Sequence, residues 1–210
     1  MYLYSRAGRL APGQTRRASA WAVEITERAN QISDLDIELW ATVFSPGLGT
    51  LAWTTFVEDL SQLEAAEAKL LADNSYVDMV DAGAAFAAGG IDDQVATVVY
   101  GTMQPDVRPE YVTAVTATLA SGGLVKGTTG AIEIAQRVEQ LVGRPCLVTA
   151  PQTGRYGSIE WLVGHPDVAA LQASAVALGA DAGLVELIDR TAPGAYVEGA
   201  SVQTVYRRVV

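Results

Sequence analysis

The sequence has few residues of the kinds that bind metals or form cross-links. Cys146 is its one cysteine and His165 its one histidine. A single cysteine cannot form an intramolecular disulfide, so nothing indicates an oxidising compartment. One histidine and one cysteine without clustered carboxylates make no recognisable ligand set, so no metal site is predicted. The nucleophile pattern G-x-S-x-G of many hydrolases is also absent.

Basic residues and long apolar runs are scarce as well. Lysine and arginine number 14 against 24 aspartates and glutamates, which gives a formal net charge of −10. This balance disfavours nucleic acid and anionic membrane surfaces as partners. No apolar run reaches the roughly 18 residues of a membrane span, and the first residues lack the basic and apolar segments of a signal peptide. We therefore expect a cytoplasmic protein.

The chain repeats itself once. Glu24, Ile25 and Arg28 recur 109 positions later as Glu133, Ile134 and Arg137. Gly49-Thr50-Leu51-Ala52-Trp53 recurs 108 positions later as Gly157-Ser158-Ile159-Glu160-Trp161, and the same offset continues to Asp81 and Asp189. A period near half the chain length indicates two copies of one module. We expect modules at 1–101 and 111–210, joined by a linker at 102–110.

In each copy, the pattern of apolar and turn residues predicts the element order βαββαβ. The strands expected in the first copy span 2–10, 37–44, 50–57 and 95–100, and the first helix ends near residue 32. Asp59 or Ser61 caps the second helix, where Ser61 and Glu64 have the spacing of a capping box. A further helical piece covers 75–86, and Ala88-Gly89-Gly90 ends it. The second copy repeats this order, with strands at 111–119, 146–149, 156–162 and 202–209 and helical segments between them.

A βαββαβ unit forms a four-stranded antiparallel sheet with both helices on one face, the ferredoxin-like arrangement. Two such sheets can face each other and close, which leaves few free strand edges. The predicted fold class is therefore α+β, with two tandem ferredoxin-like units that form an intramolecular pseudo-dimeric α/β barrel.

In this element order, in the strand pattern G-[TS]-[LI]-x-W and in the Asp-initiated helix that follows, the chain resembles the dimeric α/β-barrel superfamily. That group includes the antibiotic-biosynthesis-monooxygenase, NIPSNAP and EthD types, muconolactone isomerase and haem-degrading monooxygenases. The resemblance covers the whole chain but includes no catalytic motif. Because members of the group differ widely in their chemistry, it implies a fold and not an activity.

Polar and aromatic residues that occur in one copy only are the candidates for a specialised site. Arg6 corresponds roughly to Ala114, Glu38 to Leu147 and Glu160 to Ala52. A charge inside a strand is costly unless it is paired, and a pair between Glu38 and Arg6 is plausible. The candidates to line an apolar ligand cavity are Tyr4, Arg6, Glu38, Trp40, Glu160 and His165. The competing interpretation is that the charges lie at strand ends in water and that the tryptophans pack in the core.

His165 is the one candidate for an axial haem ligand, which the family resemblance makes worth testing. It precedes Pro166 at the expected start of a helix, where an N-terminal capping or loop role is the simpler interpretation. Such a position is poorly suited to project across a sheet face. We therefore predict that haem is not the normal cofactor.

Two function classes remain open at this point. The first is a protein that binds or converts a small hydrophobic molecule without a metal or nucleotide cofactor, for example by cofactor-independent oxygenation or isomerisation. The second is a non-catalytic structural or interaction protein whose barrel is filled by its own side chains. Haem binding through His165 is a third alternative, and assembly into homo-oligomers stays open.

Overall fold

The computed structural model describes residues 1–103 and 107–210, so the middle of the predicted linker, 104–106, lies outside the described residues. The chain divides into two compact units. Unit 1 contains Met1–Ala96 and Arg207–Val210, and unit 2 contains Thr97–Tyr206. The chain passes from one unit to the other within β4 (Ala87–Tyr100) and returns within β8 (Val202–Arg208).

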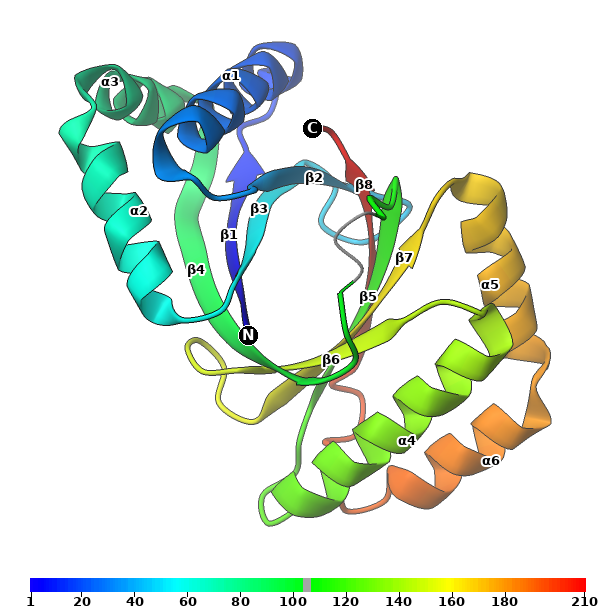
Figure 1. The fold of residues 1–210 in the computed structure, drawn as a ribbon. Helices are drawn as coiled ribbons and strands as arrows, with labels where there is room; N and C mark the ends of the chain where they lie inside the picture. Colours follow the sequence, from blue (N-terminus) through cyan, green and yellow to red (C-terminus); the bar gives the residue numbers. More distant parts are fainter. Residues whose placement is uncertain (104–106) are drawn as a thin grey trace. The chain divides into compact units, whose positions relative to one another are not determined.

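The element order in unit 1 follows the sequence expectation, and Figure 1 shows its helices on one side of its strands. The elements before β4 are β1 (Tyr2–Leu10), α1 (Thr15–Ser33), β2 (Glu38–Val43), β3 (Thr50–Val57), α2 (Leu60–Ala72), α3 (Asn74–Gly83) and the short 3-10 helix η1 (Ala84–Phe86).

Unit 2 has the same order and again places its helices on one side of its strands (Figure 1). Its elements before β8 are β5 (Tyr111–Thr118), α4 (Leu124–Val142), β6 (Cys146–Pro151), β7 (Ser158–His165), α5 (Val168–Ala180) and α6 (Ala182–Thr191). The fold is thus a mixed α+β one.

The strand pairing is antiparallel with matching registers in the two units. In unit 1, β3 pairs with β1 and β2, so that Arg6 lies opposite Trp53 and Glu38 opposite Thr54. In unit 2, β7 pairs with β5 and β6 in the same way. Hydrogen-bonded neighbours follow the cyclic order β1-β3-β2-β8-β5-β7-β6-β4, which is the strand order of a closed eight-stranded barrel. Packing of one sheet face against the other stays a prediction.

The helix-facing sides of the two sheets differ in how much apolar surface they bury. Unit 2 has a continuous cluster that includes Ala131 and Ala135 of α4 and Ile159, Trp161 and Val163 of β7. The corresponding buried cluster of unit 1 consists of Ala22, Leu39 and Leu51, with Trp21 and Trp53 packed against it. Alternate strand residues face opposite sides of a sheet, so these clusters identify which residues point toward the helices.

Three local expectations need correction. Asp59, not Ser61, caps α2, because its carboxylate accepts hydrogen bonds from the backbone N–H groups of Ser61 and Gln62. Strand β4 begins at Ala87 instead of residue 95, since the neighbouring β1 stabilises an extended chain through Gly89 and Gly90. His165 is the last residue of β7 and is buried, so it neither caps a helix nor lies in a loop.

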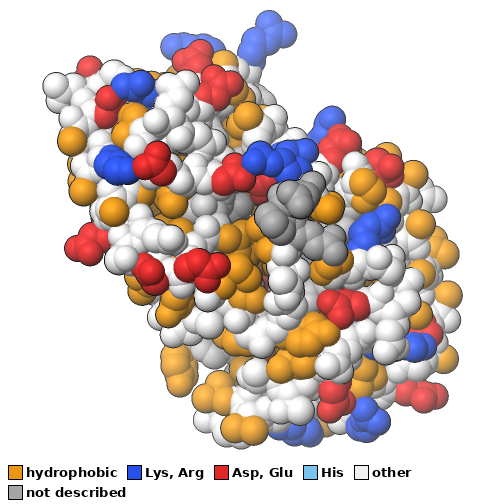
Figure 2. Space-filling model, in the orientation of Figure 1, with side chains coloured by type: hydrophobic (Ala, Val, Ile, Leu, Met, Phe, Trp, Pro, Cys, Tyr) orange, Lys and Arg blue, Asp and Glu red, His pale blue; other side chains and the backbone are white. Residues whose placement is uncertain are grey.

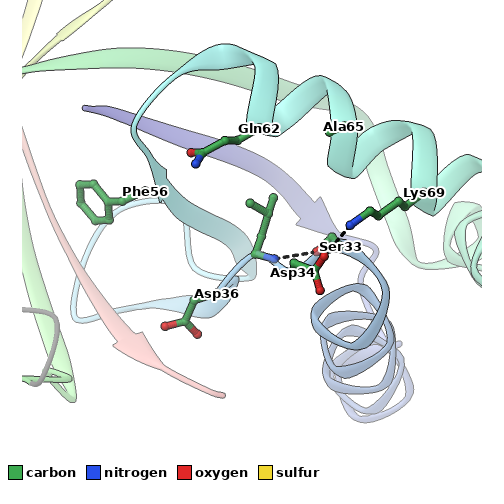
Figure 3. A pocket seen from close by; sticks show the side chains of 8 residues that line it. Ser33, Asp34, Asp36, Phe56, Gln62, Ala65 and Lys69 are labelled. Atoms are coloured by element: carbon green, nitrogen blue, oxygen red, sulfur yellow. Dashed lines mark hydrogen bonds and ion pairs between the residues drawn. The ribbon is translucent and has the colours of Figure 1, made fainter.

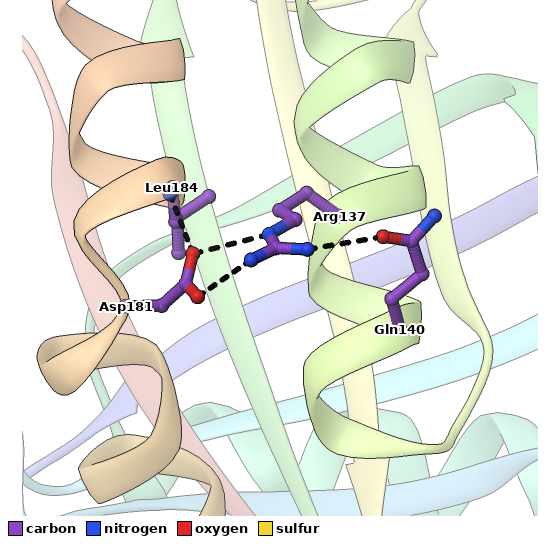
Figure 4. Close-up of polar contacts among 4 residues, drawn as sticks. All are labelled: Arg137, Gln140, Asp181 and Leu184. Atoms are coloured by element: carbon purple, nitrogen blue, oxygen red, sulfur yellow. Dashed lines mark hydrogen bonds and ion pairs between the residues drawn. The ribbon is translucent and has the colours of Figure 1, made fainter.

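In both units, an arginine and an aspartate at equivalent positions form an ion pair that links the helices. In unit 2, Arg137 of α4 donates two hydrogen bonds to Asp181, whose carboxylate also caps α6 through the N–H of Leu184 (Figure 4). In unit 1, Arg28 of α1 pairs with Asp73, which caps α3 through the N–H of Tyr76. The repeated Arg and Asp positions therefore have a structural role.

The surface mixes charged and apolar side chains. On the face in Figure 2, acidic, basic and apolar residues are interspersed. No single helix in residues 1–103 and 107–210 is long and apolar enough to span a membrane. Helices α5 and α6 reach the required length and composition only together, and the chain bends by 69° between them.

Candidate functional site

A polar cluster lies on the helix-facing side of the unit 1 sheet. Strand β1 places Tyr4 and Arg6 two residues apart on one face, opposite Thr55 and Trp53 of β3. Because Trp53 packs with Trp21 of α1, with ring centroids 6.0 Å apart in an edge-to-face arrangement, this is the side that the helices cover. Sequence alternation in β1 therefore directs a tyrosine and an arginine toward the helices.

The charge of Arg6 is balanced by Asp93 of β4. The Nε and one terminal nitrogen of Arg6 each donate a hydrogen bond of 2.7 Å to the Asp93 carboxylate. Both side chains are partly exposed. The bidentate hydrogen bond from Arg6 holds the pKa of Asp93 below its ordinary value. The pair is thus neutral overall, and the outer edge of the guanidinium still carries N–H donors.

Two phenol groups lie near this ion pair and stay uncharged. Burial, opposed by the charge of Arg6 and reinforced by that of Asp93, raises the pKa of Tyr4 from 10.0 to about 12. Burial also raises the pKa of Tyr76 of α3, which lies within electrostatic range of the same two residues. Both tyrosines therefore act as neutral hydrogen-bonding groups at physiological pH.

Thr55 adds a hydroxyl that has no partner. Its side chain is 3% exposed, and its Oγ1 makes no hydrogen bond to any described residue. It lies directly opposite Tyr4 in the β1–β3 register. A buried hydroxyl without a partner costs about 1–3 kcal/mol, so native proteins usually supply a partner, which can be water or a ligand.

Two positions of the polar cluster are apolar in unit 2. The registers equate Arg6 with Val115 and Thr55 with Val163; Val163 belongs to the helix-facing core cluster, and Val115 is partly buried and packs against it. Arg6 thus corresponds to Val115, one residue from the rough alignment with Ala114. Tyr4 corresponds to Thr113, whose hydroxyl contacts His165, so the described part of unit 2 keeps a polar group here but has no equivalent of Arg6.

Glu38 and Trp40 lie on the other side of the unit 1 sheet. Leu39 between them is in the helix-facing core, so its two neighbours on β2 point away from the helices. The indole N–H of the buried Trp40 donates a 2.8 Å hydrogen bond to Thr54. The structure pairs Arg6 with Asp93 and not with Glu38, because the register places Arg6 and Glu38 on opposite faces.

Glu160 lies on the corresponding face of the unit 2 sheet. Its carboxylate accepts hydrogen bonds from the hydroxyls of Thr116 at 3.3 Å and Thr149 at 3.4 Å. Burial raises the pKa of Glu160 above its ordinary value, and the two hydroxyls only partly offset this effect. Glu160 therefore makes a second polar group, separate from the cluster in unit 1.

His165 is held inside unit 2 between β5 and α5. The side chain is 2% exposed, its Nε2 lies 3.1 Å from the Thr113 hydroxyl, and its Nδ1 lies 3.3 Å from the Ser174 hydroxyl. Ser174 already donates to the backbone carbonyl of Ala170, so Nδ1 carries the proton and donates to Ser174. Both ring nitrogens are thus occupied, and His165 does not fit the role of an axial haem ligand.

Two open surface clefts lie elsewhere. One, of about 310 Å³, is in unit 1 beside the end of α1, where Lys69 pairs with Asp34 and where Asp36, Phe56 and Gln62 contribute to the lining (Figure 3). The other, of about 350 Å³, is in unit 2 and includes Lys126, Glu133 and Arg190. Neither is lined by a predicted site residue, so the apolar ligand cavity stays a prediction.

Comparison with known proteins identifies similar folds. No family model matches the sequence, and no curated protein matches it either. A Fusobacterium nucleatum protein provisionally named a monooxygenase aligns over 100% of this chain and 92% of its own, with a TM-score of 0.71 and 6% identity. An anthrone oxidase-like protein aligns over 100% and 91%, with a TM-score of 0.69 and 10% identity. A heme-binding protein from Thermus thermophilus aligns over 100% and 91%, with a TM-score of 0.52 and 10% identity.

The fold is that of the dimeric α/β-barrel proteins. Identities this low show the fold alone, so the function rests on the residues of this chain. Of the predicted site residues, Tyr4 and Arg6 share the helix-facing side of the unit 1 sheet, Glu38 and Trp40 share its other side, and Glu160 and His165 lie in unit 2.

Sequence reasoning missed Thr55, Tyr76 and Asp93. Comparing the copies more closely finds the first two, since Thr55 corresponds to Val163 and Tyr76 to Leu184. Nothing in the sequence indicated a site role for Asp93, because the fourth strand was expected to begin only at residue 95.

Proposed function

We propose that the protein binds a small aromatic molecule with a carbonyl or hydroxyl group at Tyr4, Arg6, Thr55 and Tyr76, between the unit 1 sheet and α3. The observation that carries the proposal is the unpartnered hydroxyl of Thr55 beside Tyr4. The groups around it are mainly hydrogen-bond donors with no net charge, which suits an acceptor oxygen on a neutral ligand. The nearby rings of Trp53 and Trp21 suit an apolar ligand body.

The proposed reaction class is oxygenation of an activated C–H group without a metal or nucleotide cofactor. When such a substrate loses its proton to water, the negative charge develops on the carbonyl oxygen. Tyr4, Tyr76 and the outer edge of Arg6 are donors that can stabilise this enolate. The enolate reacts with O₂ and then loses water to give a ketone, as in anthrone plus O₂ giving anthraquinone plus water. Two of the similar structures, the Fusobacterium nucleatum protein provisionally named a monooxygenase and the anthrone oxidase-like protein, carry names that describe oxidative chemistry for those proteins.

Anthrone is therefore the probe for the first test. We expect it to quench the fluorescence of Trp53 and Trp21, and to consume O₂ faster with the protein than without it. Thr55→Val and Tyr4→Phe should each weaken binding by roughly tenfold, since a lost hydrogen bond inside a buried site costs about 1–2 kcal/mol. In the absence of ligand, Thr55→Val should stabilise the protein by about 1 kcal/mol, because it removes an unpaired buried polar group.

Tyr156→Phe is the matched control, since Tyr156 is 86% exposed in unit 2 and should leave binding unchanged. Equal anthrone affinity in Tyr4→Phe, Thr55→Val and the unchanged protein would contradict the proposed site. Binding without added O₂ consumption would support the site and contradict the reaction, which leaves the non-catalytic alternative.

Haem binding through His165 is disfavoured by the two hydroxyl partners of its ring. We expect that added haem gives no sharp Soret band that depends on His165. A Soret band that disappears in His165→Ala would overturn this expectation.

We also infer a tandem duplication of a ferredoxin-like module. The repeated βαββαβ order, the equal strand registers and the repeated Arg–Asp pair support it. The module bounds 1–101 and 111–210, the barrel formed by facing sheets, the cytoplasmic location and assembly into homo-oligomers are proposals of the same kind.

A further inference from the structure

The carboxylate of Glu160 is the centre of a second polar row, on the face of the unit 2 sheet away from the helices. Strand β7 runs between β5 and β6, and its register places Glu160 directly opposite Thr116 on one side and Thr149 on the other. Each threonine hydroxyl donates to a different carboxylate oxygen, at 3.3 Å and 3.4 Å. The three side chains form a straight line across the sheet.

No cation balances this carboxylate among the described residues. Its partners are the two neutral hydroxyls, and the phenol of Tyr206 in β8 lies within electrostatic range of it. Burial raises the pKa of Tyr206, and the charge of Glu160 raises it further, so the phenol stays neutral. A partly buried carboxylate without a positive partner is costly, which makes its presence in one copy only informative.

The accessible hydrogen-bond acceptors of the row belong to Glu160 and Thr116, which are half-buried, whereas Thr149 is fully buried. Since Thr116 uses its proton on the carboxylate, its remaining lone pairs and the free lone pairs of Glu160 are the ones that a ligand can reach. One step along the strands, about 7 Å away, lies an apolar row of Ala114, Leu162 and Leu147. An acceptor-rich anionic row beside an apolar row matches a ligand with a cationic donor head and a short apolar tail.

We propose that Glu160, Thr116 and Thr149 form a binding site for a small primary alkylammonium ion, separate from the proposed site in unit 1. The N–H donors of a primary ammonium match the two carboxylate oxygens of Glu160 and the hydroxyl oxygen of Thr116, and the alkyl tail covers Leu162. Thr149 is buried and positions the carboxylate by donating a hydrogen bond to it. Thr116 and Glu160 are only partly buried, so the head group can reach them. The first copy has Trp40 and Ala52 at the positions of Thr149 and Glu160, so it lacks this polar row.

The test uses n-butylammonium on the full chain, measured by isothermal titration calorimetry near neutral pH. We expect a Kd on the order of 1 mM. Glu160→Gln should weaken binding by at least about tenfold, and Thr149→Val by a smaller factor, since a hydrogen bond to a charged group contributes more than a neutral one. Glu186→Gln, which removes an exposed charge from α6 in the same unit, is the matched control and should have no effect.

n-Butanol separates the charged head from the apolar tail as the source of affinity. Butanol binding as tight as that of butylammonium, equal affinity in the Glu160→Gln protein, or no heat of binding at about 10 mM would each overturn the proposal. Thr116→Val provides a second variant if Glu160→Gln folds poorly. Because neither ligand contains a carbonyl and the variants lie in unit 2, failure here leaves the anthrone test in unit 1 unaffected.

Discussion

At the scale of single residues, His165 shows how burial changes the behaviour of an ionisable group. Burial, with the positive charge of Arg144 as a smaller cause, lowers the pKa of His165 from 6.5 to about 4. The neutral ring is favoured in the folded protein, where it links Thr113 to Ser174. His165 thus joins a strand to a helix and is not a proton donor near neutral pH.

This pKa predicts a specific loss of stability in acid. The pKa of His165 is lower in the folded protein than in the unfolded chain, where it is about 6.5. The neutral ring therefore contributes stability above about pH 6.5, and that contribution is lost as the pH falls toward about 4. His165→Gln, which cannot ionise, should be less stable than the unchanged protein at about pH 7, and the difference should shrink as the pH falls toward about 4. Urea unfolding at a series of pH values measures it. A difference that stays constant with pH would contradict the prediction.

At the scale of elements, Asp181 connects three helices of unit 2. It ends α5, caps α6 and accepts two hydrogen bonds from Arg137 of α4 (Figure 4). The hydrogen bonds from Arg137, and then that from the N–H of Leu184, lower the pKa of Asp181 below its ordinary value. Asp73 has the equivalent position in unit 1, so each helix layer depends on one carboxylate.

We predict that Asp181→Asn lowers the urea midpoint at about pH 7 and has a much smaller effect at about pH 3. A carboxylate with a lowered folded pKa stabilises the protein above its unfolded pKa and loses that effect as the pH falls through the folded value. Asp189→Asn, an exposed aspartate on α6, is the control and should leave the midpoint unchanged at both pH values. Equal effects of Asp181→Asn at both pH values would show that the charge is not involved.

At the scale of the whole molecule, unit 1 is completed by a chain segment that is distant in sequence. Arg207–Val210 belong to unit 1, although the rest of β8 belongs to unit 2. The N–H of Val209 donates to the carbonyl of Leu39 at 2.7 Å, and the N–H of Leu39 donates to the carbonyl of Val210 at 2.8 Å. Leu39 is fully buried on β2, so these bonds complete the edge of that strand.

Deletion of Arg207–Val210 should therefore destabilise unit 1. It leaves two backbone groups of Leu39 without partners, and we expect the free energy of unfolding to fall by about 2 kcal/mol. Val210→Ala keeps both backbone hydrogen bonds and is the control. Urea unfolding followed by tryptophan fluorescence measures the change, and an unchanged midpoint in the deletion variant would contradict the prediction.

The sequence by itself determined the element order and the copy-specific residues. Alternation with period two and the helical spacing are local properties, so β1, α1, β3 and the α2–α3 pair could be predicted within a few residues. The 108-residue offset identified the Asp73 and Asp181 positions as common to both copies, and it also identified Glu160 as unique to one. The helices and strands could be predicted because their periodic patterns depend on neighbours in the chain.

Only the tertiary structure decided which side chains meet. Arg6 and Asp93 are 87 positions apart, and their pairing depends on where β4 begins and on which face β1 directs its side chains. The same holds for Thr55, whose missing partner follows from the β1–β3 register and the helices above it, and for His165, which a strand end buries beneath α5. Shifting a strand by one residue exchanges its two faces, so local patterns cannot determine such contacts.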